Sequence, residues 1–341
     1  TAGTFTASTG TVNCNGSSAQ TIGGYTYNVL KSNNTAGITP VAALTITTLT
    51  IADVTAGSVF NDGGFAVTTA TTLNLNSGTY NCTASSFPWG TASIGGTVNY
   101  SLAGAQTVAN KTYTNLGISG GGSSVKTLAA STPTTVSGTL TIAAATTLAF
   151  STTAQTLALT GTGANTLTSS GTIDMSTGPN AAHVLKIASS ITAFGGTLTT
   201  GTGSAVEFTV TTGGQTIPSK TYNNLTLDNT SGANTAGGNL TVNGTLTTTA
   251  GGTLDMASYS GSSFGASSVN NGKIRWSANN VYVAGAGTTE FYTSTAGNIA
   301  VGSAYGNIWI TGTNKTIPAG TAVTAAGGIA AFGVTVDGSL T

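Results

Sequence analysis

The sequence contains very little charge. Only 5% of its residues are Asp, Glu, Lys or Arg, whereas an average soluble domain has about 25%. Eight basic and eight acidic residues give a formal net charge of zero, so no positive field attracts nucleic-acid phosphates or anionic lipid headgroups. We therefore expect no nucleic acid among the partners, and a near-zero net charge favours self-association.

Long apolar runs, prolines and helical patterns are also scarce. No apolar run reaches the roughly 18–20 residues of a membrane helix, so we expect no membrane insertion. Thr1 is not followed by a charged and then apolar leader, so any secretion signal has been removed or lies outside this sequence. Residues 181–190 are the best helix candidate and are short, and we expect almost no helix.

Groups that catalyse reactions are few. His183 is the only histidine, and no nucleophile-elbow pattern surrounds a serine near it, so we interpret it as a structural or surface residue. Glu207 and Glu290 hold the same place in successive repeats, where a spacing of four coils keeps them roughly 20 Å apart. That distance is too great for a catalytic carboxylate pair. We predict that the chain is not an enzyme and has no catalytic residues.

Metal and cofactor motifs are absent as well. The calcium-binding phrase Gly-Gly-x-Gly-x-Asp does not occur, and residues 61–64, "NDGG", read as a lone turn. Two cysteines and one histidine cannot form a zinc site. The glycine-rich residues 117–126 lack the Gly-Lys-Ser/Thr ending of a phosphate-binding loop, which favours a loop of the repeat. We expect no metal site and no cofactor.

Cys14 and Cys82 are the only cysteines and lie in similar phrases, "TVNCNG" and "TYNCTA". A disulfide between them is worth about 4 kcal/mol in the chain-entropy model and implies an oxidising compartment. The alternative is a pair of buried thiols. The low-charge, Thr/Asn-rich composition suits an exported protein, and on this ground we expect the disulfide.

What the chain does contain is alternating β-branched sequence. Thr, Ser, Gly, Ala and Asn are interrupted by short apolar pairs, as in "LTITTLTI" at 44–51. Alternation with period two, broken by Gly and Asn, is typical of many short strands. We predict an all-β fold.

Four unequal copies of one pattern run through the chain. They align on Tyr27, Tyr113, Tyr222 and Tyr305, which are 86, 109 and 83 residues apart. The longer interval exceeds the others by about one coil of a β-solenoid, which tolerates such a gain because each coil contacts only its neighbours. We therefore predict one elongated repeat domain over 1–341, resembling a parallel β-helix, with repeats at about 10–95, 96–203, 204–287 and 288–341.

The repeated phrases resemble a known family. Residues 215–218 (QTIP), 222–227 (YNNLTL) and 242–246 (VNGTL) are similar to those of secreted β-strand repeat proteins of Bacteroidetes-like bacteria, and more distantly to autotransporter and filamentous-haemagglutinin passengers. The resemblance implies a secreted, cell-surface fibrous role and often a parallel β-helix. No C-terminal sorting domain is recognisable, which leaves the export route open.

Two alternatives to this interpretation stay open. Repeats of about 85–110 residues also suit tandem immunoglobulin-like sandwiches, although no Pro-rich linkers separate the copies and Trp89, Trp276 and Trp309 lack a fixed place in them. The repeated tyrosines could form a carbohydrate-binding strip, but an aromatic residue at a fixed repeat position more often fills a solenoid corner. We assign the tyrosines to the core.

The sequence thus predicts an extracellular structural protein that forms a surface fibre with copies of itself. The alternatives are an adhesin that binds glycans or host surfaces and, less favoured, an ice-binding solenoid, since Thr-x-Thr does not recur at a constant coil spacing. A head-to-tail contact by strand donation places Thr4, Phe5 and Thr6 of one subunit against its neighbour's Val334, Val336 and Leu340.

Overall fold

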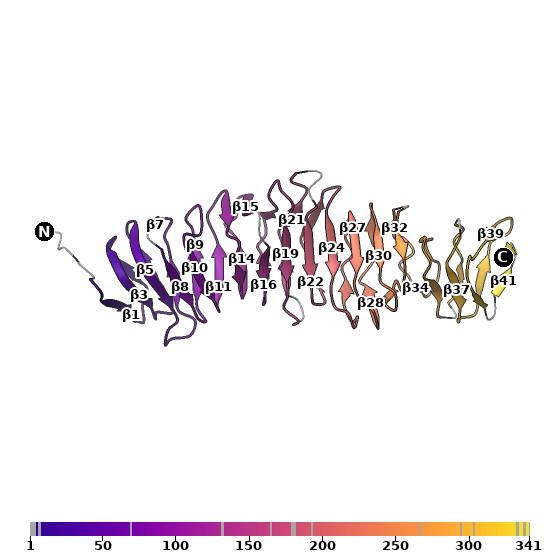
Figure 1. Ribbon diagram of the computed structural model, residues 1–341, viewed down its shortest axis with the longest axis horizontal. Coiled ribbons are helices and arrows are strands. Elements are labelled where there is room, and N and C mark those ends of the chain that lie inside the picture. The colour runs from indigo at the N-terminus through magenta and orange to yellow at the C-terminus, as the bar shows by residue number, and fades with distance from the viewer. Residues whose placement is uncertain are drawn as a thin grey trace. The chain divides into compact units, whose positions relative to one another are not determined.

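The computed structural model describes residues 5, 8–68, 70–130, 133–163, 166–178, 182–191, 194–265, 267–293, 295–302, 304–331, 334–336 and 339–340, with side chains as far as residue 330. All the regular secondary structure in this described part is β-strand (Figure 1). The strands are parallel and stack as a β-solenoid of about 15 turns. The solenoid prediction is confirmed, and tandem antiparallel sandwiches are wrong. Residues 181–190, the best of the weak helix candidates, contain the strand β22 (Val184–Ile187).

The chain divides into two compact units. Unit 1 comprises 1–161, 167–174 and 195–197, and unit 2 comprises 162–166, 175–194 and 198–341. Two strands, β21 (Thr172–Met175) and β23 (Thr197–Thr200), have residues in both.

Unit 1 consists of parallel sheets whose neighbouring strands come from successive coils (Figure 1). The first sheet contains β1 (Thr11–Cys14), β3 (Thr26–Ser32), β5 (Leu44–Ile51), β8 (Thr72–Leu75) and β10 (Thr91–Ile94), with β7 (Val67–Thr68) beside β5. The second contains β2 (Gln20–Ile22), β4 (Ile38–Pro40), β6 (Val59–Asn61), β9 (Thr79–Cys82), β11 (Thr97–Tyr100), β14 (Asn115–Ile118), β17 (Leu140–Ile142) and β20 (Leu167–Ser169). Two further runs are β12 (Gln106–Val108), β15 (Ser124–Leu128), β18 (Thr146–Ala149) and β21 (Thr172–Met175), and β13 (Thr112–Tyr113), β16 (Thr134–Val136) and β19 (Thr156–Leu159).

Unit 2 repeats this plan. One run contains β22, β24 (Ala205–Phe208), β27 (Asn224–Leu227), β30 (Leu246–Thr248) and β33 (Val269–Asn270). The longest sheet that lies wholly within unit 2 contains β25 (Thr216–Ile217), β28 (Ala233–Ala236), β31 (Thr253–Asp255), β34 (Lys273–Trp276), β35 (Thr288–Phe291), β37 (Asn307–Ile310) and β40 (Ile329–Ala331). Short sheets complete the coils: β26 (Thr221–Tyr222), β29 (Thr241–Val242) and β32 (Ser263–Phe264); β36 (Gly297–Asn298), β38 (Lys315–Ile317) and β41 (Val334–Val336); and β39 (Ala322–Val323) with β42 (Ser339–Leu340).

Alternation along each strand produces the core. In β11, Val98 and Tyr100 are fully buried, whereas Thr97 and Asn99 face outward. The strand register then places similar side chains of successive coils above one another, as in the column Leu116, Leu140 and Leu167. Each fully buried leucine contributes about 1.5–3 kcal/mol relative to an exposed one, so these interior columns hold the coils together.

Coil length varies while the register is kept. The outward positions of Asn99 and Gly117 are partners 18 residues apart, whereas Thr141 and Thr168 are partners 27 residues apart. The additional residues are accommodated in the turns between strands. The glycine-rich stretch at 117–126 contains such a turn, in which Gly121 and Gly122 have φ of 63° and 57°, a conformation that glycine adopts without strain.

Candidate functional site

The four repeat tyrosines fill corners of the solenoid. All are buried, none more than 4% exposed, and burial raises the pKa of each hydroxyl, that of Tyr305 to about 12. Each hydroxyl donates to a backbone carbonyl four or five residues earlier: Tyr27 to Gly23 (3.0 Å), Tyr113 to Ala109 (2.7 Å), Tyr222 to Pro218 (2.7 Å) and Tyr305 to Ala300 (2.5 Å). Their assignment to the core is confirmed, and buried rings cannot form a carbohydrate-binding strip.

A second corner contact was missed by the sequence analysis. The Nε2 of Gln106 donates to the carbonyls of Cys82 (2.8 Å) and Ala84 (2.6 Å) in the preceding coil, and Gln215 bonds Ile187 and Ser189 in the same way. The signal was present in the sequence, because Gln20, Gln106 and Gln215 each stand seven residues before a repeat tyrosine. These amides satisfy carbonyls that the turn leaves without strand partners.

Two lysines make similar corner contacts. Lys126 and Lys315 are buried; Lys126 donates to the carbonyls of Leu102 and Gly104, and Lys315 to those of Ser277 and Thr295. Desolvation lowers the pKa of both ammonium groups. In unit 1 the lysine takes the place of the glutamine in the next coil, since Lys126 is the strand partner of Gln106. Lysine and glutamine therefore both serve as interior donors at solenoid corners.

The turn "NDGG" holds a buried carboxylate. Asp62 is fully buried and accepts hydrogen bonds from the backbone N–H groups of Gly64 (3.0 Å), Thr83 (2.8 Å) and Ala84 (3.2 Å). These contacts fasten one coil to the next. Within the described residues, no group of three or more His, Cys, Asp or Glu is arranged to hold a metal ion.

The expected disulfide is wrong. Cys14 and Cys82 are both buried free thiols. Cys14 lies on β1, whereas Cys82 lies on β9, in another sheet and three coils further along the stack. Three coils at about 4.8 Å each separate them by roughly 14 Å along the axis, and a disulfide needs Cα atoms less than about 7 Å apart. The alternative of two buried thiols is confirmed.

The residues predicted for assembly lie at the first and last described coils. Phe5 is 41% exposed, with its ring centroid 5.6 Å from that of Tyr25 and 5.5 Å from that of Tyr27. Val334 and Val336 belong to β41, which pairs with β38, and Leu340 belongs to β42, which pairs with β39. Thr4 and Thr6 lie outside the described residues.

The titratable residues considered for catalysis are dispersed. His183 is buried, and its Nε2 lies 2.7 Å from the carbonyl oxygen of Thr177. Glu207 on β24 forms an ion pair with Lys186 (3.0 Å), and Glu290 on β35 forms one with Lys273 (3.0 Å). The two glutamates lie on different sheets of unit 2, so their supposed equivalence is wrong, and they do not form a pair.

The outer face of the second sheet of unit 1 carries a ladder of side-chain amides. Asn99 donates from Nδ2 to Oδ1 of Asn81 (2.9 Å), and Asn81 donates to Oδ1 of Asn61 (2.6 Å). The ladder continues to the hydroxyl of Thr39 (3.1 Å). In the other direction it stops at Gly117, the strand partner of Asn99, which has no side chain to continue it.

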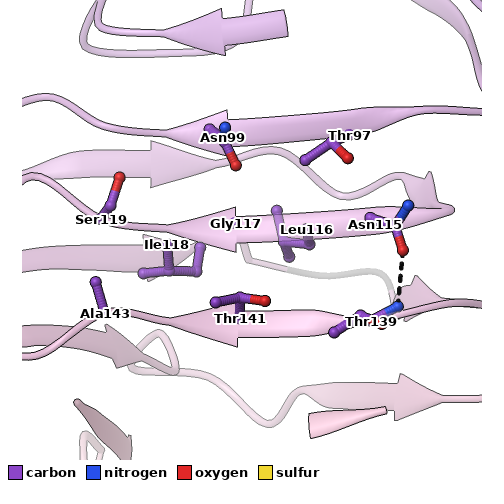
Figure 2. A pocket seen from close by; sticks show the side chains of 10 residues that line it. All are labelled: Thr97, Asn99, Asn115, Leu116, Gly117, Ile118, Ser119, Thr139, Thr141 and Ala143. Carbon is purple, nitrogen blue, oxygen red and sulfur yellow. Dashed lines mark hydrogen bonds between the residues drawn. The ribbon is translucent and has the colours of Figure 1, made fainter. Parts of the chain in front are cut away.

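This interruption leaves a shallow hollow of about 440 Å³ on the sheet. Figure 2 shows Gly117 on the middle strand, with Asn99 on one neighbouring strand and Thr141 on the other. At the end of the hollow, Oδ1 of Asn115 accepts a hydrogen bond from the N–H of Thr139 (3.0 Å; Figure 2). No charged or aromatic side chain lines this hollow, which makes it a weak candidate for a binding site.

The outer face of the longest sheet of unit 2 is charged and aromatic. Register aligns Asp255, Arg275, Glu290 and Trp309 on successive strands. Arg275 pairs with Asp255 (2.7 Å), and its guanidinium lies 4.7 Å from the Tyr292 ring centroid. Lys273 pairs with Glu290, and its Nζ lies 4.7 Å from the Trp309 ring centroid.

Beside these residues lies a polar hollow of about 380 Å³. Glycines that precede successive strands line it, together with Thr253, Lys273, Thr288 and Asn307. The glycines are required by the close approach of the backbone, since a Cβ on Gly287 would lie 2.1 Å from the carbonyl oxygen of Gly272. This hollow and Trp309 together form the strongest candidate site, which we call the Trp309 site.

No helix long and apolar enough to span a membrane occurs in the described part of the chain. No protein-family model, curated protein or solved structure matches the sequence.

Proposed function

We propose that this chain is an extracellular structural protein and a subunit of a self-assembling surface fibre. The amide ladder Asn61–Asn81–Asn99 carries this proposal. Stacked Asn ladders accompany parallel strands in fibrous assemblies, where identical side chains bond along the stacking axis. A solenoid built in this way extends in one dimension, because each coil needs only its neighbours.

The low charge supports the same proposal. The zero formal net charge leaves little repulsion between copies, and strand edges provide N–H and C=O groups for pairing between chains. A head-to-tail contact that does not close into a ring gives an open filament. We place that contact between the segment around Phe5 of one copy and the strands β41 and β42 of the next.

Negative-stain electron microscopy of the purified chain tests the proposal. We expect filaments whose length increases with protein concentration, and discrete particles at every concentration would contradict the fibre function. Deletion of residues 1–10 is expected to abolish filaments while circular dichroism still shows a folded β protein. Val54→Ala is the matched control, since Val54 is 79% exposed in unit 1 and belongs neither to the deleted segment nor to β41 or β42.

The contacts of Phe5 refine this design. Because its ring packs on Tyr25 and Tyr27 of its own chain, donation to a neighbour has to replace these two contacts. Phe5→Ala is therefore expected to weaken the donated strand without altering the coils. If the deletion variant forms filaments normally, this segment is not the joint. The fibre function itself is then tested by microscopy of the full chain alone.

A further inference from the structure

Trp309 differs from the two other tryptophans of the chain. Trp89 is 2% exposed and Trp276 is 0% exposed, whereas Trp309 is 40% exposed. It lies on β37 between Ile308 and Ile310, which are both fully buried. The strand therefore directs two apolar residues inward and a large aromatic ring outward, where burial in the core cannot account for it.

The surroundings of the ring leave part of it open. On the side of the preceding coils, Lys273 lies over the ring and Glu290 is the strand partner of Trp309. On the other side the strand partner is Ala330, which is small and exposed. One part of the indole is thus supported by the protein, and the part beside Ala330 is left accessible.

The polar hollow lies next to the ring on the same sheet. Asn307 lines the hollow and is two residues from Trp309 on the same outward face, so about 7 Å of strand separates them. Lys273 belongs to both, because it lines the hollow and reaches over the ring. The hollow's volume of about 380 Å³ falls within the range of roughly 300–1,000 Å³ found for ligand sites.

The charges of this face cancel. Lys273 is paired with Glu290 and Arg275 with Asp255, which leaves no net charge to select an acidic or a basic ligand. What remains is an aromatic face beside hydroxyl, amide and ammonium groups. A neutral sugar chain fits this combination, because each pyranose ring has an apolar C–H face and a rim of hydroxyl groups.

We propose that the Trp309 site binds a neutral oligosaccharide. Trp309 supports the C–H face of one sugar unit, and the hydroxyl groups of the next unit bond Thr253, Thr288 and Lys273 in the hollow. This binding role is independent of the fibre function, because every residue of the site belongs to a single chain and none lies on β41, on β42 or in the segment around Phe5. A chain that forms no filaments therefore still tests it.

The experiment uses the fluorescence of the protein's own tryptophans. Acrylamide quenches exposed indoles, and Trp309 is the exposed one of the three. Titration with soluble neutral glucan, mannan and galactan oligosaccharides is expected to protect Trp309 from quenching with at least one of them. Raising the salt concentration should leave the affinity unchanged, because no net charge is involved.

Three substitutions make the test specific. Trp309→Ala is expected to weaken the binding measured by calorimetry about two- to tenfold, in line with the roughly 0.5–1.5 kcal/mol of a good aromatic contact, and Trp309→Phe should retain part of the affinity. Thr288→Val removes one hydroxyl and should weaken binding severalfold. Tyr25→Ala is the matched control and should leave binding unchanged, since Tyr25 is 41% exposed in unit 1.

Circular dichroism establishes that each variant is folded. If none of the neutral oligosaccharides protects Trp309, the proposal is wrong. It is equally overturned if Trp309→Ala binds as well as the unsubstituted chain, or if protection occurs only with acidic glycans or with peptides.

Discussion

The outer face of the β9–β11–β14 sheet in unit 1 and that of the β31–β34–β35–β37 sheet in unit 2 share one parallel register but carry different chemistry. In unit 1, Asn81 and Asn99 belong to a ladder of neutral amides. In unit 2, Arg275 and Glu290 occupy matching outward places. Arg275 forms an ion pair with Asp255, and Glu290 forms one with Lys273. Four of the chain's sixteen charged residues gather there, which is a strong concentration in a chain with so little charge.

The difference shows that the register fixes positions and leaves the outer side chains free to vary. Neutral amides bond along the stack without the desolvation cost that charges incur. Partly exposed ion pairs contribute only about 0–1 kcal/mol each, so stability does not account for their concentration in unit 2. The binding proposed at the Trp309 site would give these charges a role, since the ion pair with Glu290 holds Lys273 in place.

The largest effects should be the same in both units, because the tyrosine corners are common to them. Tyr113→Ala in unit 1 and Tyr222→Ala in unit 2 should each lower the free energy of unfolding by about 3–5 kcal/mol, as for other buried aromatic residues. The Phe variants should cost about 1–3 kcal/mol, since a carbonyl loses its partner. Urea unfolding followed by circular dichroism measures the free energy of unfolding of all four variants. A large difference between the Tyr113 and Tyr222 variants would show that the tyrosine corners of the two units are not equivalent.

The same corners should set an alkaline limit to stability. Burial raises the pKa of Tyr305 from 10.0 to about 12, so its contribution is complete below about pH 10 and is lost as the pH rises through 12. Two pKa units correspond to about 3 kcal/mol. Buried Lys126 and Lys315 act oppositely, because their lowered pKa values make stability rise with pH between those values and 10.5.

Urea unfolding at a series of pH values between neutral and strongly alkaline measures this limit. The free energy of unfolding should fall steeply only above the ordinary tyrosine pKa, and Tyr305→Phe should make the fall shallower. A decline that is already present near neutral pH would show that other groups control it.

The sequence predicted those features that repetition determines. Alternation and the recurring phrases around Tyr113 and Tyr222 led to the solenoid and to its tyrosine corners, because each coil poses the same packing problem. The missing disulfide shows the opposite case. The similar phrases around Cys14 and Cys82 gave no information on how many coils separate them, since coil length varies from one turn to the next.

The Trp309 site was also beyond the sequence analysis. In "NIWI" the tryptophan lies within an apolar run that suits a buried strand equally well. Only the register, which turns Ile308 and Ile310 inward, places the indole outside. The hollow beside it depends on Gly272 and Gly287 from different coils, whose proximity in space has no local signal.

Substitutions on the two outer faces should differ in how far salt changes their effect on the free energy of unfolding, and this effect is smaller than those above. Arg275→Ala removes the pair with Asp255 and the contact with Tyr292, and should cost up to about 1 kcal/mol at low salt. At about 1 M salt, where the Debye length is about 3 Å, most of the electrostatic part should vanish. Asn81→Ala should cost about 1 kcal/mol at either salt concentration. Equal salt dependence of the two variants, measured by urea unfolding, would contradict the distinction between a neutral and a charged face.

The smallest effect tests whether the amide ladder itself stabilises unit 1. Gly117→Asn should extend the ladder, because Gly117 is the strand partner of Asn99 as Asn99 is of Asn81. A Cβ at Gly117 would lie 1.9 Å from Oδ1 of Asn99, so that flexible carboxamide has to turn, as it can on an open face. Gly117→Ala is the matched control, since it removes the conformational freedom of glycine without adding an amide. We expect Gly117→Asn to be more stable than Gly117→Ala by about 0.5–1 kcal/mol, the worth of one further hydrogen bond. If the two variants unfold at the same urea concentration, the ladder only accompanies the stacking of the coils and does not strengthen it.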